Sequence, residues 1–293
     1  MMIKFRTTRL MHAFRFLLTG ILFVSILSGC ASQKNAGSTK PFFFIQLSDP
    51  QLGFYPDSIQ KEIALYERGV AEVNRLKPDF VVITGDLVNK PRDQHQLAEF
   101  KRITAMINAK IPVYYTPGNH DVGNTPAKAD VDFYNAIYGY DKFSFNHKNS
   151  RFIGINSNLI KANTPVLEQE QYIWLEKELA ANKQADHIII FCHHSFFISK
   201  PDEPVEYFNI DMATRNKYLE LFKKYGVTAV FAGHYHRNGY GKYGDMEMVT
   251  TSAIGEPLGK DPSGFRIITV GKDKIAHQYY SLDSIPQRVD VGR

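Results

Sequence analysis

Cysteine and tryptophan are scarce in this sequence, and the scarcity limits how the fold can be stabilised. The 293 residues include two cysteines, Cys30 and Cys192, and one tryptophan, Trp174. Two cysteines cannot provide the set of disulfide bonds that holds many small exported domains together. Hydrophobic residues make up 44% of the chain, which is enough for a large buried core in one domain or at most two.

Beyond residue 29 the sequence also lacks a clear excess of charge of either sign. The formal net charge is +5, and residues 1–29 contain four basic residues and no acidic residue, so the rest of the chain carries 5 − 4 = +1. A protein that binds nucleic acid usually carries a clustered basic surface. We therefore expect no nucleic-acid partner.

The apolar run near the N-terminus, residues 16–27, is shorter than the roughly 20 residues that a membrane-spanning helix needs. It follows a basic stretch, as in a secretion signal. It ends in Leu27-Ser28-Gly29-Cys30, which resembles the lipobox of bacterial lipoproteins and implies lipid on Cys30. An ordinary signal peptide or a signal anchor is the alternative. We expect a lipoprotein signal peptide over residues 1–29, a flexible tether over 30–40, and an exported protein anchored to a bacterial membrane, periplasmic or at the cell surface.

Apolar runs alternate with amphipathic stretches in the next part of the chain. Runs at residues 42–47, 80–84 and 111–116 predict buried strands. Apolar residues spaced by three and four predict helices over residues 59–76, with Asp57 or Ser58 as a cap, and over 97–107. This alternation predicts an α/β layer with mainly parallel strands.

The second half of the chain continues this pattern and then changes. Strands are expected at residues 151–155, 187–191 and 227–231, and helices around 168–183 and 218–225. Short runs at 246–251, 265–270 and 275–280, separated by glycine turns, indicate antiparallel pairing. We expect two mixed sheets between helices in a domain over residues 41–283, followed by a C-terminal tail over 284–293.

Polar side chains follow five of the predicted strands. Because ligands collect at the carboxyl ends of strands in open α/β sheets, these side chains are candidates for one site. Each group alone has a structural explanation as a cap or a turn, but together they are oxygen and nitrogen donors suited to metal ions. The groups are Asp49 and Gln51; Asp86; Asn119 and His120; His193 and His194; His234 and His236.

These motifs, in this order, resemble those of the calcineurin-like metallophosphoesterase superfamily. The resemblance covers about residues 42–281, and it implies a four-layer α-β-β-α sandwich with two metal ions, which could be Mn, Fe or Zn. The matching motifs are Asp49-Pro50-Gln51, Gly85-Asp86, Gly118-Asn119-His120-Asp121, His193 and Gly233-His234-Tyr235-His236.

The resemblance also implies roles for these residues. Asp86 bridges the two ions, and a bridging hydroxide attacks phosphorus. His120 stabilises the transition state or protonates the leaving oxygen, and Asp121 orients His120 by a hydrogen bond. The first ion is expected to bind Asp49, Gln51, Asp86 and His236, and the second Asp86, Asn119, His193 and His234.

Gln51 departs from the family pattern, because many members have histidine there. A neutral amide oxygen is a weaker donor, so the first ion is expected to bind less tightly or to differ in identity. Other residues carry less weight: Asn89 and Arg92 could reach a substrate or simply form a loop. Asn156 and Asn158 could line the cleft or turn the chain, and strand alternation assigns Cys192 to the core.

We expect an enzyme that hydrolyses phosphate esters, first a phosphomonoesterase. The alternatives are a phosphodiesterase, for a cyclic nucleotide or another diester, and a non-catalytic surface protein that keeps the fold. The substrate is expected to be a phosphorylated small molecule or a phosphoprotein, and the protein a monomer.

Overall fold

The computed structural model describes residues 40–55 and 59–292. The predicted signal peptide, the lipid attachment at Cys30, almost all of the tether and the cap at Asp57 or Ser58 therefore lie outside the described residues. No helix in the part of the chain that the structure describes combines the length and the apolar character needed to cross a membrane.

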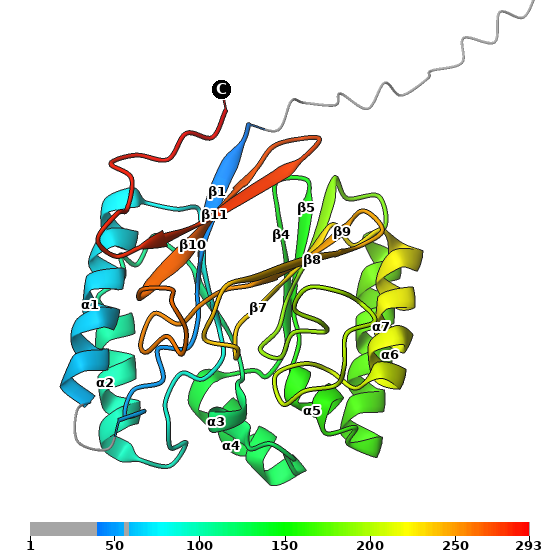
Figure 1. Cartoon of the computed structure of the whole chain (residues 1–293), viewed down its shortest axis with the longest axis horizontal. Helices are drawn as coiled ribbons and strands as arrows, with labels where there is room; N and C mark the ends of the chain where they lie inside the picture. The colour runs from blue at the N-terminus through cyan, green and yellow to red at the C-terminus, as the bar shows by residue number, and fades with distance from the viewer. Residues whose placement is uncertain (1–39, 56–58, 293) are drawn as a thin grey trace, which may run out of the picture. The chain divides into compact units, whose positions relative to one another are not determined.

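Two mixed β-sheets form the centre of the described domain (Figure 1). In the five-stranded sheet, β1, β2 and β3 run parallel, and β10 and β11 extend the sheet with antiparallel pairing. Its spatial order is β11 (Ile275–Ser281), β10 (Gly264–Val270), β1 (Phe42–Leu47), β2 (Val81–Thr84) and β3 (Val113–Thr116).

The six-stranded sheet has four parallel strands in the middle and one antiparallel strand at each edge. The antiparallel pairing predicted beyond residue 246 is right for β10 and β11, but β9 also pairs in parallel with β7. The order is β4 (Phe143–His147), β5 (Ser150–Gly154), β6 (His187–Phe191), β7 (Ala229–Ala232), β9 (Met246–Thr250) and β8 (Gly239–Tyr243).

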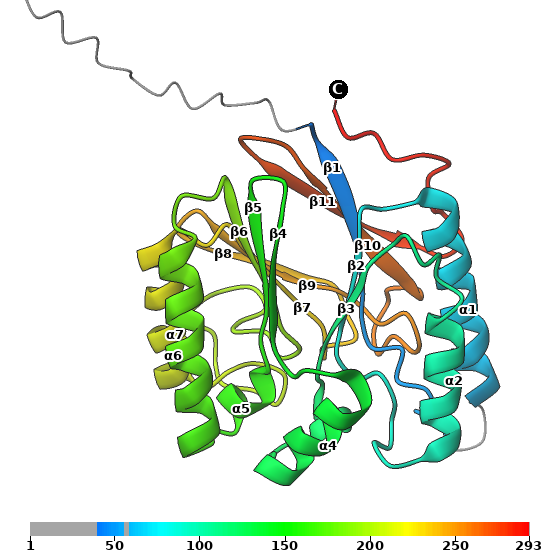
Figure 2. The ribbon, with the colours of Figure 1, turned by 180° about the vertical axis from the view of Figure 1, so that it is seen from behind.

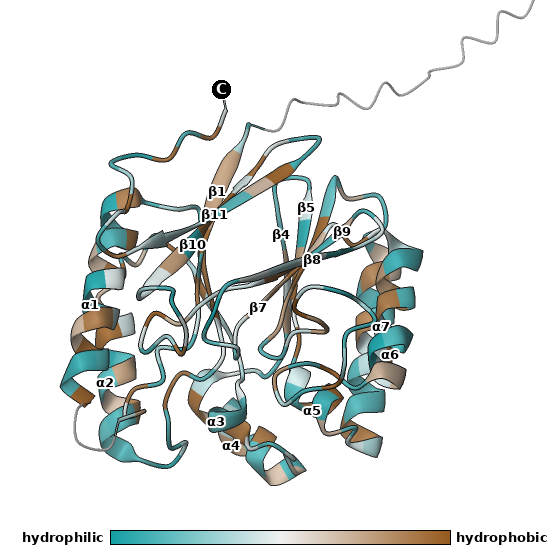
Figure 3. Cartoon of the chain, viewed as in Figure 1, coloured by the Kyte–Doolittle hydropathy of each residue, from teal (hydrophilic) through white to brown (hydrophobic). Residues whose placement is uncertain are grey.

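Helices cover the outer face of each sheet, as the views from opposite sides show (Figures 1 and 2). Their residues join the sheets in two separate buried clusters. Hydrophobic and hydrophilic residues alternate along the two helices on the five-stranded sheet, as expected for amphipathic helices (Figure 3). The helices are α1 (Ile59–Leu76) and α2 (Gln94–Thr104) on the five-stranded sheet, and α6 (Pro165–Ala181) and α7 (Met212–Tyr225) on the six-stranded sheet.

Phenylalanine fills the space between the two sheets. The rings of Phe44 and Phe80 stack with centroids 4.7 Å apart, and Phe191 of the opposite sheet meets Phe44 edge-on at 5.6 Å. Strands that are buried on both faces read as continuous apolar runs, which explains why β1 and β2 were recognisable. The four-layer α-β-β-α arrangement predicted from the sequence is confirmed.

The parallel strands of both sheets direct their carboxyl ends to the same region of the domain. Shorter helices lie near these ends (Figure 1). One of them begins directly after β3 and carries part of a predicted motif. They are α3 (Asn119–Val122), α4 (Lys128–Tyr138) and α5 (Ser157–Lys161).

Candidate metal centre

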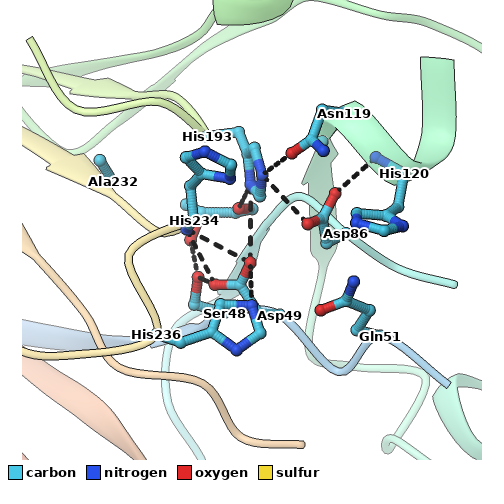
Figure 4. A network of polar contacts seen from close by, with 12 residues as sticks. Ser48, Asp49, Gln51, Asp86, Asn119, His120, His193, Ala232, His234 and His236 are labelled. Atoms are coloured by element: carbon cyan, nitrogen blue, oxygen red, sulfur yellow. Dashed lines mark hydrogen bonds and ion pairs between the residues drawn. The ribbon is translucent and has the colours of Figure 1, made fainter. Parts of the chain in front are cut away.

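The predicted ligands lie together at the carboxyl ends of β1, β2, β3, β6 and β7, although up to 187 positions separate them in the sequence, 236 − 49 = 187 (Figure 4). Asp86 belongs to two groups of side chains whose donor atoms lie within 4.8 Å of one another. The first group contains Asp49, Asp86 and His236, and the second contains Asp86, His193 and His234.

The two amide side chains complete these groups. Asn119 Oδ1 lies 3.1 Å from His193 Nε2, so the two atoms face the same point. Gln51 is buried, and its Oε1 has no hydrogen-bond partner among the described residues. His234 Nε2 is likewise buried without a partner in that part of the chain. Buried polar atoms normally have partners, so these two atoms fit a site built for cations.

Backbone carbonyls fix the orientation of two histidine rings. His193 Nδ1 donates to the carbonyl of Thr84 at 2.9 Å, and His236 Nδ1 donates to the carbonyl of Glu256 at 2.5 Å. Each ring therefore turns Nε2 inward, where His193 Nε2 lies 3.3 Å from Asp86 Oδ2. Metal-binding histidines are usually held through the other ring nitrogen in this way.

The backbone of this site adopts conformations that ordinary residues avoid. Eight non-glycine residues among those described have a left-handed φ, and five of them are predicted ligands. Such conformations persist only where the surrounding structure enforces them, and they gather at functional sites. The five are Asp49 (φ 50°), Gln51 (φ 37°), Asp86 (φ 47°), His234 (φ 66°) and His236 (φ 52°).

Glycine in two of the motifs allows loops to approach each other closely. A Cβ atom on Gly118 would lie 2.1 Å from both the backbone nitrogen and Oδ1 of Asp86. A Cβ atom on Gly233 would lie 2.0 Å from Ser48 Oγ and 2.6 Å from Asp49 Oδ2. Neither distance is possible for a real side chain, so these glycines are needed for the ligand loops to meet.

The electrostatics of the site depend on the pair formed by Asp86 and His193. Burial opposes ionisation of the Asp86 carboxyl, but His193 outweighs it and holds the pKa of Asp86 below its usual value. Burial also opposes protonation of His193, but Asp86 raises the pKa of His193 to about 9. Burial and repulsion from His193 lower the pKa of His234 to about 3. His234 is therefore neutral at neutral pH, whereas a metal ion must displace a proton from His193.

One predicted contact is wrong. His120 Nδ1 lies 3.0 Å from the carbonyl oxygen of Asn89 rather than beside the Asp121 carboxylate. Asp121 instead accepts hydrogen bonds from the backbone amides of Gly118 at 2.8 Å and Leu87 at 3.1 Å. Neighbouring residues of a helix do not face each other, which explains why Asp121 cannot orient the ring before it. Its carboxylate holds the loops after β2 and β3 together.

Apart from Asn89, which contacts Gln51, the residues given less weight have mainly structural roles. Arg92 stacks on Phe133, with the guanidinium carbon 4.1 Å from the ring centroid. Asn158 Nδ2 donates to the carbonyl of Pro117 at 2.9 Å and so supports the loop that carries Gly118. His194 is buried, and its ring packs on His234 at 4.1 Å between centroids. Cys192 is fully buried in the cluster beneath α6 and α7, as predicted.

Two contacts of the site were not foreseen in the sequence. Asn89 Oδ1 accepts from Gln51 Nε2 at 3.3 Å, and Tyr207 Oη accepts from Asn119 Nδ2 at 3.2 Å. Asn89 follows Gly85-Asp86 closely, and the sequence indicated that it could reach a substrate or form a loop, but it gave no sign of the contact with Gln51. Tyr207 lies in a stretch without periodic apolar residues, so its position gave no signal.

Comparison with known proteins gives the class of this chain. The model of the calcineurin-like phosphoesterase family matches residues 44–238. The serine/threonine-protein phosphatase CPPED1 of Homo sapiens is 37% identical over 284 residues, which cover 89% of this chain and 90% of that protein. A probable glycerophosphodiester phosphodiesterase of Arcobacter nitrofigilis is 30% identical over 57% of this chain and 61% of its own length. The chain therefore belongs to the calcineurin-like phosphoesterase family.

The fold described above also occurs in a solved phosphatase structure. A dimetal phosphatase from Danio rerio superposes with a TM-score of 0.56 at 16% identity, over 82% of this chain and 99% of that one. Family membership and the two candidate metal groups support phosphoester hydrolysis as the activity, so the prediction of a hydrolase is confirmed. CPPED1 of Homo sapiens is eukaryotic and lends no support to a bacterial lipoprotein, which stays a prediction.

Proposed function

We propose that this chain is a two-metal phosphomonoesterase whose substrates are phosphoserine or phosphothreonine residues of proteins. One observation carries the two-metal part: the single carboxylate of Asp86 belongs to both groups of donors. Two metal ions, when bound, polarise phosphate oxygens and activate the attacking water. The substrate class is supported by the name of the human relative, which aligns with 89% of this chain.

Seven side chains would hold the two ions. The donors mix carboxylate and amide oxygens with imidazole nitrogens, which suits Mn, Fe or Zn and does not select among them. The first ion is assigned to Asp49, Gln51, Asp86 and His236, and the second to Asp86, Asn119, His193 and His234.

His120 is assigned as the acid that protonates the leaving oxygen. Its backbone nitrogen donates to Asp86 Oδ1 at 2.9 Å, which places it beside the shared carboxylate. A carbonyl can only accept, so the contact with Asn89 requires the proton on Nδ1. Nε2 is then the nitrogen free to face the substrate. It gives a proton to the departing alcohol oxygen when the ring is doubly protonated, which leaves the neutral ring with its proton on Nδ1, and its position next to the ligand loop supports this role.

Hydrolysis of a diester is the second candidate. The bacterial relative named for glycerophosphodiester hydrolysis supports it, but that protein matches 57% of this chain. A non-catalytic binding protein is disfavoured because the predicted ligand side chains from both sheets are present and gathered at one place.

Three substrates separate these functions: p-nitrophenyl phosphate, its bis ester, and a phosphoserine peptide, each with Mn²⁺ or with a chelator. We expect turnover of the monoester and the peptide that depends on metal. Preference for the bis ester would favour a phosphodiesterase, and no metal-dependent turnover of any substrate would reject the enzyme. His120→Ala should lose turnover, whereas His95→Ala, on the exposed face of α2, should not.

We also propose that the protein is exported and held at a bacterial membrane, periplasmic or at the cell surface, by lipid on Cys30. The motif Leu27-Ser28-Gly29-Cys30 after the apolar run supports this proposal. Growth of an expressing bacterium with labelled palmitate should label the wild type but not Cys30→Ser. Label in neither protein would reject the lipid anchor.

A further inference from the structure

Gln51 and Asn119, assigned as ligands of different ions, are the amide members of the site. An amide group has one end that can bind a metal, the carbonyl oxygen, and one end that cannot, the NH₂ group. The two ends are similar in size, and a half turn about the last bond exchanges them. An amide therefore serves as a metal ligand only when another residue holds its NH₂ group on the outer side.

Asn89 holds the NH₂ group of Gln51. Gln51 Nε2 donates to Asn89 Oδ1 at 3.3 Å, and this contact turns Gln51 Oε1 into the buried site, where it has no partner among the described residues. The backbone keeps the two residues in register, because the nitrogen of Asn89 donates to the carbonyl of Leu52 at 3.1 Å. The orientation of the Gln51 amide thus depends on one oxygen atom.

Tyr207 holds the NH₂ group of Asn119. Asn119 Nδ2 donates to Tyr207 Oη at 3.2 Å, and Tyr207 Oη in turn donates to Asn124 Oδ1 at 3.4 Å. Because the hydroxyl hydrogen is used by Asn124, a lone pair of Oη faces Asn119. Asn119 Oδ1 is left facing His193 Nε2, at 3.1 Å.

The loop that carries Tyr207 is held in place by hydrogen bonds of Arg215 and Glu203. Tyr207 itself is 60% exposed, so its position must come from its neighbours. Arg215 is fully buried and donates to the carbonyls of Ile210 at 2.9 Å and of Glu203 at 2.8 Å. The Glu203 carboxylate accepts from the amide of Ile198 at 2.7 Å. These contacts fix both ends of the loop, and they place the Tyr207 ring against His234, with centroids 4.9 Å apart.

We propose that Asn89 and Tyr207 are positioning residues, one for each metal site, which hold the NH₂ groups of Gln51 and Asn119 so that the carbonyl oxygens face the ions. The proposal rests on the ligand sets of the proposed function. It also explains how Gln51 can serve where many family members have histidine. An amide in that place needs the Asn89 side chain to hold its NH₂ group away from the ion.

Titration of the metal-free full chain with Mn²⁺ alone tests the proposal by calorimetry. Loss of a residue that orients a ligand typically lowers metal affinity about 10–100-fold. We expect that fall for one ion in Asn89→Ala and for one ion in Tyr207→Phe, which keeps the ring over His234. Neither side chain belongs to the buried core, so the fold should survive, and thermal unfolding of the metal-free variants checks it.

Two ligand variants identify which site each residue serves. Asn89→Ala should lower affinity no further in a Gln51→Ala background, yet show its full effect in an Asn119→Ala background. Tyr207→Phe should lower affinity no further in an Asn119→Ala background, yet show its full effect in a Gln51→Ala background. Asn89→Asp, which keeps an acceptor oxygen, should bind Mn²⁺ more tightly than Asn89→Ala. Tyr240→Phe, which removes an exposed hydroxyl on β8, should change nothing.

The proposal is overturned if both single variants bind two Mn²⁺ ions within about threefold of the wild-type affinity, or if the effect of Asn89→Ala persists without Gln51. A wild type that binds fewer than two ions also overturns it. Turnover of p-nitrophenyl phosphate, measured on the same samples, separates this result from the proposed function. A wild type that binds two ions without turnover would reject the enzyme while the binding data still decide the roles of Asn89 and Tyr207.

Discussion

Replacing Gly118 by alanine should destroy the metal centre without removing any predicted ligand. A Cβ atom at this position would lie 2.1 Å from the backbone nitrogen of Asp86, whereas ordinary contacts begin at 3.4 Å, so the two loops must separate by 3.4 − 2.1 = 1.3 Å. Asp86 cannot yield easily, because its carbonyl accepts from the nitrogen of Gln51 at 2.8 Å and its Oδ1 accepts from the nitrogen of His120 at 2.9 Å.

The size of the effect follows from this displacement. Metal–ligand distances tolerate about 0.2 Å, so the shift is several times too large for Asp86 and Asn119 to bind the same ion. A misplacement of about 1 Å can reduce turnover about 10²-fold, and we expect at least that loss together with loss of bound metal. Overpacking costs about 1–3 kcal/mol, which corresponds to a melting temperature lower by about 2–12 °C in a domain of this size.

Three measurements on one preparation check the prediction: metal content by elemental analysis, turnover of p-nitrophenyl phosphate with added Mn²⁺, and thermal unfolding. Gly271→Ala is the matched control, because a Cβ atom there meets its nearest neighbour, the carbonyl oxygen of Lys274, at 3.4 Å. It lies directly after β10, at the end of the sheet away from the site. A Gly118→Ala protein with two bound ions and wild-type turnover would refute the reasoning.

Three further outcomes are expected. His120→Ala should keep both ions while turnover falls about 10²–10⁴-fold, whereas Asp86→Ala should lose both ions in elemental analysis; two ions in the Asp86 variant would contradict the shared carboxylate. Cys192 should resist alkylation until the domain unfolds, because burial raises the pKa of its thiol and keeps reagents out; modification of the native protein, seen by mass spectrometry, would contradict its core position. Because Asp86 raises the pKa of His193 to about 9 against the effect of burial, Mn²⁺ binding below that pH must displace a proton, and affinity should rise with pH by up to about tenfold per unit and level off above it; a titration that gives the same affinity across neutral pH would contradict this.

The central strands could be predicted because their own residues determine them. Strands β1 and β6 are buried on both faces, so they appear as continuous apolar runs. The edge strands β4 and β8 were missed, since β8 consists of Gly-Tyr-Gly-Lys-Tyr and depends on pairing with β9 rather than on a pattern of its own. Edge strands gain their stability from a neighbour that the local sequence does not reveal.

The ligands could be predicted from their motifs, but the contacts that orient them could not. The family resemblance implied a hydrogen bond from Asp121 to His120, but the two residues are neighbours in a helix, and helical geometry prevents this contact. Tyr207 meets Asn119 across 88 positions of sequence, within a loop whose shape depends on the buried Arg215. Such contacts depend on tertiary packing, so no local sequence pattern predicts them.

The left-handed backbone of five predicted ligands has a consequence for the evolution of this domain. Each such residue costs of the order of 1 kcal/mol or more, so the site opposes folding that the two sheets must drive. Glycine adopts these angles without strain, and Asp49→Gly or His236→Gly should melt at a higher temperature than the corresponding alanine variant while losing the ligand. A single substitution to glycine would thus remove a ligand and, with it, the backbone strain at that position. We expect stable, inactive descendants of this fold to arise easily, and we expect selection for catalysis to be what keeps the strained residues in place.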